Sequence, residues 1–310
     1  MRRALAFAIY GLGTSNKTLV GAGGHRLRRS ILATRAGATV LLAILSILLA
    51  QRGVAQEVAR PAEDSQIEKV RAELVKSIEW NQYYLDGREQ PLKPHVIMKW
   101  NNQVRGGGTV VGLSVVWTDE TRPQVIASIY PWEGILTQEY DVLARDDKVV
   151  AKANDRVVWR PATTGIEFHT FPRAPSPAKS QAQRRLQLKE LAEQFEVTMI
   201  GWSFEKADRE QLRLLPQPLY RYGGEGKDVL DGALFGYVIG TDPEAALMIE
   251  AFRTEDGKYQ WQYAFVRQTS GGLEAKLRDE VVWTAEKRPG EDDPRKAHFR
   301  LLRPLPVELR

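Results

Sequence analysis

Two stretches of this chain, Ala-Lys-Ala-Asn-Asp-Arg-Val-Val-Trp at 151–159 and Ala-Lys-Leu-Arg-Asp-Glu-Val-Val-Trp at 275–283, share six identities. The first predicts a hairpin, because Asn-Asp between two β-branched runs is a typical tight turn. Further matches follow in the same order at an offset of about 120 residues. They pair Trp80 with Trp202, Arg88-Glu89 with Arg209-Glu210, Pro123 with Pro243 and Arg145 with Arg267. Collinear matches of this kind predict two copies of one structural unit.

Each copy is predicted to begin with an amphipathic helix, because apolar residues recur there at helical spacing. These residues are Ile67, Val70, Leu74, Val75 and Ile78 in the first copy and Leu186, Leu188, Leu191, Phe195 and Met199 in the second. Short apolar runs separated by turn residues follow each helix, which predicts antiparallel strands. The predicted strands are 96–100, 110–117, 125–130, 138–145, 149–153 and 156–160, then 219–222, 233–239, 246–252, 260–267, 273–277 and 280–284, with short closing strands around Phe168 and Phe299.

The predicted fold class is therefore α+β: an internal duplication of two units, each with one amphipathic helix packed on a curved antiparallel β-sheet. The predicted organisation is a leader (1–55), a first repeat unit (56–172), a Pro-rich linker (173–180) and a second repeat unit (181–310). The pattern fits two domains as well as one pseudo-symmetric body.

The leader has the composition of a cleaved signal peptide. A basic run at 25–29 precedes an apolar stretch, Ala38 to Ala50, and the small residues Gly53-Val54-Ala55. We expect cleavage after Ala55 and a periplasmic or secreted protein. The alternative is an uncleaved membrane anchor, but the apolar stretch is shorter than the roughly 20 residues that cross a bilayer. The stretch before Arg26 is long for a signal, which suggests a translation start further downstream.

Charge and cysteine content exclude several classes. The chain has 44 basic and 39 acidic residues, and the leader holds eight of the basic residues and no acid. The remainder is slightly acidic, which disfavours nucleic-acid binding. The absence of cysteine excludes disulfides, thiolate metal sites and a cysteine nucleophile. We expect no stable transmembrane segment once the leader is removed.

No catalytic or cofactor signature stands out in the sequence. His95, His169 and His298 have no metal-ligand spacing, and a nucleophile elbow of the Gly-x-Ser-x-Gly type is absent. We therefore predict no metal, no cofactor and no catalytic residue, and the sequence favours a non-enzyme without settling the point.

Residues present in both copies are interpreted as structural. Trp80 and Trp202, like Trp159 and Trp283, are expected in the core. Arg88, Glu89, Arg209 and Glu210 are expected to form an Arg–carboxylate network at the corner between helix and sheet. The candidates for ligand or partner binding are residues that depart from the repeat, because such departures are where function is expected. They are Trp132, Glu133 and Arg105.

Several stretches resemble exported planctomycete-type bacterial proteins of unknown function. They are Lys99–Asn102, Tyr130–Gly134, Leu214–Tyr222, Asp231–Phe235, Gly240–Glu244 and Trp261–Phe265. The resemblance covers nearly all of the chain after the leader. That group has no assigned activity, cofactor or catalytic residue, so the resemblance implies no function.

The leading hypothesis is a non-enzymatic envelope protein that binds a ligand or a partner between helix and sheet. Its partner would be a small apolar molecule, a glycan or an envelope protein. One alternative is a structural or interaction protein of the cell envelope. The other is an extracytoplasmic hydrolase with a carboxylate pair, about 5 to 10 Å apart, between the two repeats.

Overall fold

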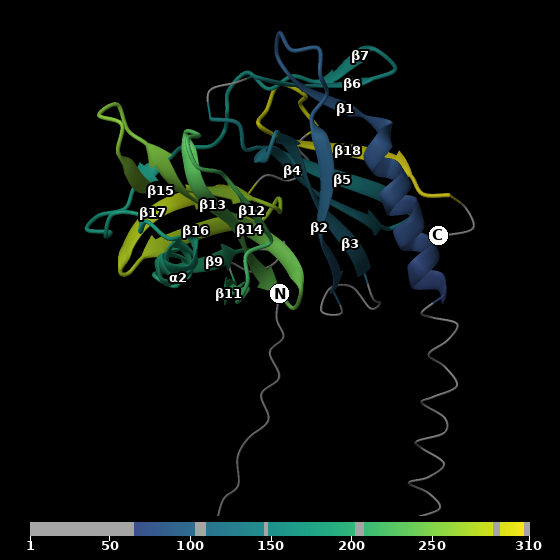
Figure 1. Cartoon of the computed structure of the whole chain (residues 1–310). Helices are drawn as coiled ribbons and strands as arrows, with labels where there is room; N and C mark the ends of the chain where they lie inside the picture. The colour runs from purple at the N-terminus through teal and green to yellow at the C-terminus, as the bar shows by residue number, and fades with distance from the viewer. Residues whose placement is uncertain (1–64, 103–109, 146–147, 202–207, 288–291, 307–310) are drawn as a thin grey trace, which may run out of the picture. The chain divides into compact units, whose positions relative to one another are not determined.

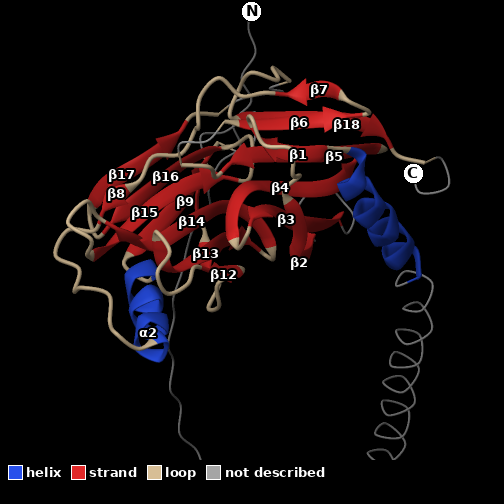
Figure 2. Cartoon of the chain, turned by 45° about the horizontal axis from the view of Figure 1, so that its top comes forward, coloured by secondary structure: helices blue, strands red, loops and turns tan. Residues whose placement is uncertain are grey.

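The structure, a computed structural model, describes residues 65–102, 110–145, 148–201, 208–287 and 292–306. Residues 61–310 form one compact unit, and all the elements described below belong to it. It is mostly β, with two α-helices and four antiparallel sheets among the described residues (Figures 1 and 2). The two predicted helices and the antiparallel pairing are therefore confirmed.

The first large sheet has five strands in the order β18-β5-β4-β3-β2. Its strands are β2 (Lys93–Asn102), β3 (Val110–Asp119), β4 (Arg122–Trp132), β5 (Ile135–Val142) and β18 (His298–Pro304). One face packs against the helix over residues 65–77 and a three-stranded sheet in the order β1-β6-β7. The strands of this smaller sheet are β1 (Gln82–Leu85), β6 (Val149–Ala153) and β7 (Arg156–Trp159), and η1 (Ile78–Trp80) joins them to the helix.

Aromatic rings fill the core between these two sheets, which is called the first core below. Tyr83 contacts Trp117 at a centroid distance of 4.5 Å and Tyr140 at 5.4 Å. Tyr140 lies 5.9 Å from Trp159. These packed rings therefore occupy the interior between the five-stranded sheet and the three-stranded sheet.

The second large sheet has the order β11-β13-β14-β15-β8, and β12 also pairs with β13. Its strands are β8 (His169–Thr170), β11 (Arg213–Leu214), β12 (Tyr220–Tyr222), β13 (Val229–Ile239), β14 (Asp242–Arg253) and β15 (Tyr259–Arg267). One face packs against α2 (Gln181–Ala192) and a four-stranded sheet, β10-β9-β16-β17. These strands are β9 (Phe195–Ile200), β10 (Arg209–Gln211), β16 (Gly272–Leu277) and β17 (Glu280–Ala285).

The remaining faces of the two large sheets pack against each other. Val116 and Ile126 from the first sheet meet Leu234, Met248 and Val266 from the second in a separate apolar cluster. Because alternate residues of a strand point to opposite faces, β4 and β14 each contribute to two cores. This junction positions the polar groups described below.

The two large sheets exchange their closing strands. β18, at the end of the chain, pairs with β5 of the first sheet, while β8 pairs with β15 of the second. Figure 1 shows the exchange by colour, because yellow β18 lies beside the blue-to-teal strands of the first sheet. Each large sheet is therefore completed by a segment from outside its own meander.

One predicted element is wrong in its extent. The second helix was expected to include Phe195 and Met199, but α2 ends at Ala192 and both residues lie in β9. In β9 buried Phe195, Val197 and Met199 alternate with more exposed residues, which is the period of a strand. Leu186, counted in the apolar face of the helix, is 63% exposed.

Candidate functional site

The tryptophans repeated along the sequence occupy different environments. Trp159 is buried, and its Nε1 donates a 2.8 Å hydrogen bond to the carbonyl of Lys296. Trp283 is half-buried and stacks on Phe265 at 5.4 Å. Trp80 is half-buried beneath the guanidinium of Arg303, 4.6 Å from the ring centroid. Trp202 lies outside the described residues.

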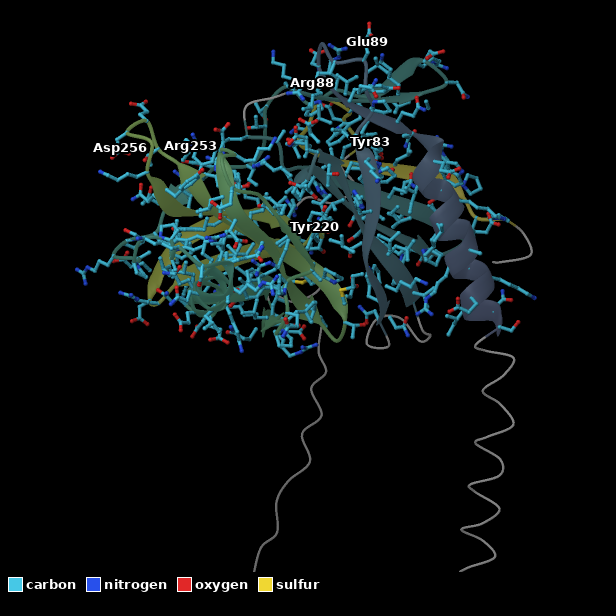
Figure 3. The ribbon with its side chains drawn as sticks, viewed as in Figure 1. Tyr83, Arg88, Glu89, Tyr220, Arg253 and Asp256 are labelled. Atoms are coloured by element: carbon cyan, nitrogen blue, oxygen red, sulfur yellow. The ribbon has the colours of Figure 1, made fainter. Side chains whose placement is uncertain are left out.

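The repeated arginines pair with acids from other elements. Exposed Arg88, next to Glu89 on the loop after β1 (Figure 3), donates to Asp119 at 2.6 Å. Arg209 in β10 pairs with Glu274 in β16, and Glu210 is half-buried beside it. These surface pairs join strands and loops, and exposed pairs of this kind contribute little stability.

The three residues predicted to bind a ligand or partner are not brought into a common site by the described contacts. Trp132 ends β4 and is 41% exposed. Glu133 follows in a tight turn with φ of 50°. Arg105 lies outside the described residues.

A different polar group forms where the two large sheets meet. Arg122 at the start of β4 donates from Nε to Glu250 at 2.9 Å. Arg145, just after β5, donates from Nη2 to the other oxygen of Glu250 at 2.7 Å. Glu250 lies within β14 and is fully buried. Two guanidinium groups, one from the first sheet and one from the segment that follows β5, therefore share one carboxylate of the second sheet.

Tyr222 in β12 adds a neutral donor to the same carboxylate. Its hydroxyl lies 3.0 Å from Oε1 of Glu250. Burial, followed by the negative charge of Glu250, raises the pKa of Tyr222 well above its usual value. The phenol therefore keeps its proton and donates, which is what a buried carboxylate requires.

Aromatic rings hold Arg145 in place. Its guanidinium carbon lies 3.6 Å from the centroid of Phe168 and 4.0 Å from that of Phe252. Its Nη1 donates to the side-chain oxygen of Gln262 at 3.0 Å. A guanidinium held by stacking and hydrogen bonds loses little freedom when it binds a further group.

A surface hollow of about 310 Å³ opens beside this cluster. Arg122, Arg145 and Gln124 line it together with the apolar side chains of Val229 and Phe252. The side chains of Arg122 and Arg145 are 18% and 20% exposed, so both reach the hollow while they hold Glu250. The volume is at the lower end of the range for small-molecule sites.

Three carboxylates stand around the hollow: Asp119, Glu120 and Asp228. Asp119 is paired with Arg88 at 2.6 Å, and Glu120 with Lys227 at 2.9 Å. The hydrogen bond from Lys227, and then its charge, lower the pKa of Glu120 below its usual value. A general acid needs the opposite shift, so this rim does not resemble the carboxylate pair of a hydrolase.

Other titratable groups lie in the buried junction between the sheets. Nδ1 of His298 is 3.1 Å from both carboxylate oxygens of Asp141, and both side chains are 5% exposed. Glu139, two residues earlier in β5, is also buried. Within the described ranges, no group of three or more His, Cys, Asp or Glu side chains has the arrangement of a metal site.

The sequence contains one signal for this cluster. Glu250 interrupts an apolar run in β14, Ala245 to Ala251, and a charged residue in a buried strand requires a partner. The partners of Glu250 come from β4 and from the segment after β5. The sequence alone does not identify them, because the pairing depends on how the two large sheets pack against each other.

Comparisons with protein-family models, with curated proteins and with solved structures find no match to this chain. Among the residues that the structure describes, none of the helices is both long enough and apolar enough to span a bilayer.

Proposed function

We propose that this protein is a non-enzymatic binding protein that takes a small organic carboxylate in the hollow beside Arg122 and Arg145. The observation that carries the proposal is the sharing of one buried carboxylate, Glu250, by two arginines that both reach the hollow. Arginine forks match carboxylate geometry, and Arg145 is already oriented by its stacking between two rings.

The surroundings of the hollow favour a singly charged ligand with an apolar part. Val229 and Phe252 supply an apolar wall. The three rim carboxylates would repel a phosphate dianion more strongly than a carboxylate monoanion, because the interaction scales with the product of the charges. A carboxylate on a small ring or short chain satisfies both the arginines and the wall.

This proposal replaces the small apolar ligand between helix and sheet with a small anion in a surface hollow. An apolar ligand in the interior needs apolar side chains that line a cavity, whereas Tyr83, Trp117, Tyr140 and Trp159 pack against one another in the first core. The hydrolase receives no support from the rim, where Asp119 and Glu120 are engaged with Arg88 and Lys227.

The proposal includes an internal duplication and an exported setting. The order of elements supports the duplication. Residues 65–159 and residues 181–285 each begin with a helix and a strand of the smaller sheet, β1 or β9. In each, a long hairpin, a third long strand and a short hairpin come later in the same order. The reciprocal exchange of β8 and β18 is what two related units would make. The basic and apolar composition of residues 1–55 supports export.

Calorimetric titration of the full chain with benzoate tests the ligand class. Benzamide, which has the same ring but no charge, serves as the neutral control, and inorganic phosphate as the dianion. We expect benzoate to bind more tightly than both. Arg122→Gln and Arg145→Lys should each weaken benzoate binding roughly 10- to 100-fold, because each removes a charge-assisted or fork-shaped contact.

Arg160→Gln is the matched control. Arg160 forms an exposed ion pair with Asp86, with a distance of 3.4 Å between them, and neither residue lines the hollow. It should leave binding unchanged. Equal affinity for benzoate and benzamide, or equal loss in the Arg160 variant, would rule out the site. Native mass spectrometry of protein purified from its own source gives an independent readout, because a retained acid would appear as mass lost on denaturation.

A further inference from the structure

The C-terminal segment is attached to the first large sheet along its whole described length. β18 pairs with β5 from His298 opposite Asp141 to Pro304 opposite Ile135. Past the strand, the Leu305 N–H donates to the Gly134 carbonyl at 2.9 Å, and Leu305 is buried in the first core. Strand pairing and core packing therefore act together here.

The residues just before β18 are attached to the same region. Arg160 N–H donates to the Pro294 carbonyl at 2.9 Å and Ala162 N–H to that of Arg295 at 2.8 Å. Nε1 of Trp159 donates to the carbonyl of Lys296 at 2.8 Å. Every one of these contacts joins residues 294–305 to residues 134–162, far away along the chain.

None of these contacts depends on which copy of the chain supplies the C-terminal segment. The attached segment begins at Pro294, so residues 286–293 connect it to β17, and an extended connection of that length reaches on the order of 25 Å. The molecule already uses this mode of attachment twice, since β8 and β18 each complete a sheet formed by other parts of the chain. Exchange of an identical element between copies forms dimers without new contacts.

We propose that β18 is an exchangeable strand through which two copies of this chain form a dimer, each C-terminal segment completing the first large sheet of the other copy. The acceptor is the edge of β5 together with the part of the first core in which Phe299 and Leu305 pack. A specific side-chain contact also fixes the register of the occupant, because Nδ1 of His298 lies 3.1 Å from the carboxylate of Asp141 at the start of the pairing. The inference is independent of the carboxylate site.

Because the chain has no cysteine, an introduced pair can report which copy supplies β18. Leu305 and Gly134 form a hydrogen-bonded pair, so the register makes Thr137 and Leu302 a non-hydrogen-bonded pair, in which Cα atoms approach closely enough for a disulfide. The test variant is Thr137→Cys with Leu302→Cys in the full chain. The matched control is Ser114→Cys with Ser128→Cys, directly opposite in the β3–β4 hairpin, which always pairs within one copy.

Each variant is warmed in reducing buffer to just below its unfolding temperature, at high and at low protein concentration. It is then cooled, oxidised and separated by denaturing, non-reducing electrophoresis. We expect the β5–β18 variant to give covalent dimer that increases at least several-fold with concentration, while the hairpin control gives only internally bonded monomer. Monomer alone from the β5–β18 variant at both concentrations would overturn the proposal, as would equal dimer formation by the control.

Discussion

The ring of Phe299 stacks on the indole of Trp159, with centroids 6.2 Å apart and planes inclined by 15°. Trp159 ends β7, whereas Phe299 belongs to β18, the final strand of the chain. The first core is therefore closed by a residue that is synthesised long after the core residues at 70–159. Its stability depends on a contact that no local segment can supply.

Phe299→Ala should lower the free energy of unfolding by about 3–5 kcal/mol, because it removes a buried ring from a packed aromatic cluster. Leu302→Ala in the same strand is the matched control. Leu302 is 43% exposed, so its truncation should change stability by only about 0.5 kcal/mol. Urea unfolding followed by tryptophan fluorescence measures both, and similar losses in the two variants would contradict the assignment of Phe299 to the core.

The His298–Asp141 pair predicts that stability falls as pH rises through the neutral range. Burial lowers the pKa of His298, but the charge of Asp141 and its hydrogen bond outweigh burial, so the net pKa is raised above its usual 6.5. A raised folded-state pKa contributes stability that is complete below pH 6.5 and is lost as pH rises through the folded value. Burial also raises the pKa of Glu139 from 4.5, which acts in the same direction.

The measurement is the free energy of unfolding from pH 5 to pH 9 for the parent chain and for His298→Gln. The parent should lose stability across this range, and the variant should show a shallower slope. Asp256 and Asp293 do not mask the effect, because hydrogen bonds from Lys258 and from Arg295 hold their pKa values at about 2. An identical slope in the variant would contradict a role for His298.

Much of the fold was accessible from the sequence because its signals are local. The Asn154-Asp155 turn is an example: both residues have positive φ, 46° and 63°, as a hairpin turn with tightly matched strands requires. The boundary between α2 and β9 was missed, because Phe195 and Met199 fit a helical as well as an alternating pattern. The exchange of β8 and β18 was not predictable, since edge pairing is decided by contacts between distant segments.

Gly112 allows Trp100 to lie flat across β3. A Cβ at this position would lie 2.1 Å from Cζ2 of Trp100, an indole that is 2% exposed. Gly112→Ala should therefore force the ring aside and cost about 1–3 kcal/mol of stability. Gly224→Ala is the control, because its nearest neighbour would be the flexible Lys227 side chain at 3.7 Å, and it should be nearly neutral. Thermal unfolding of the two variants distinguishes them.

The proposal that residues 1–55 form a cleaved leader predicts a defined new N-terminus. Expression of the full chain in a Gram-negative host, followed by mass spectrometry of the periplasmic fraction, should give a chain that begins at Gln56. Ala55→Arg should block cleavage, because small residues are required before the cut, while Ala62→Arg should leave it unchanged. Full-length protein retained in the cytoplasm would contradict the export proposal.

The candidate site was less accessible than the fold, because its parts lie in different strands. In the sequence Arg145 stands out only as a repeat match to Arg267, and the two arginines have different partners. Arg145 donates to Glu250 and Gln262, whereas Arg267 donates to the carbonyls of Thr269 and Gly271. Repetition in sequence therefore identified the position and not its chemistry.

Glu250→Gln separates the structural from the binding role of the cluster. The variant leaves Arg122 and Arg145 without their shared carboxylate, so the free energy of unfolding should fall by about 3 kcal/mol. The same change adds one net positive charge beside the hollow, so benzoate should bind several-fold more tightly. Glu274→Gln, which removes the partner of Arg209 at the surface, should alter stability by less than about 1 kcal/mol and binding not at all. A stability loss at Glu250 with weaker benzoate binding would mean that the arginines serve only to join the two sheets.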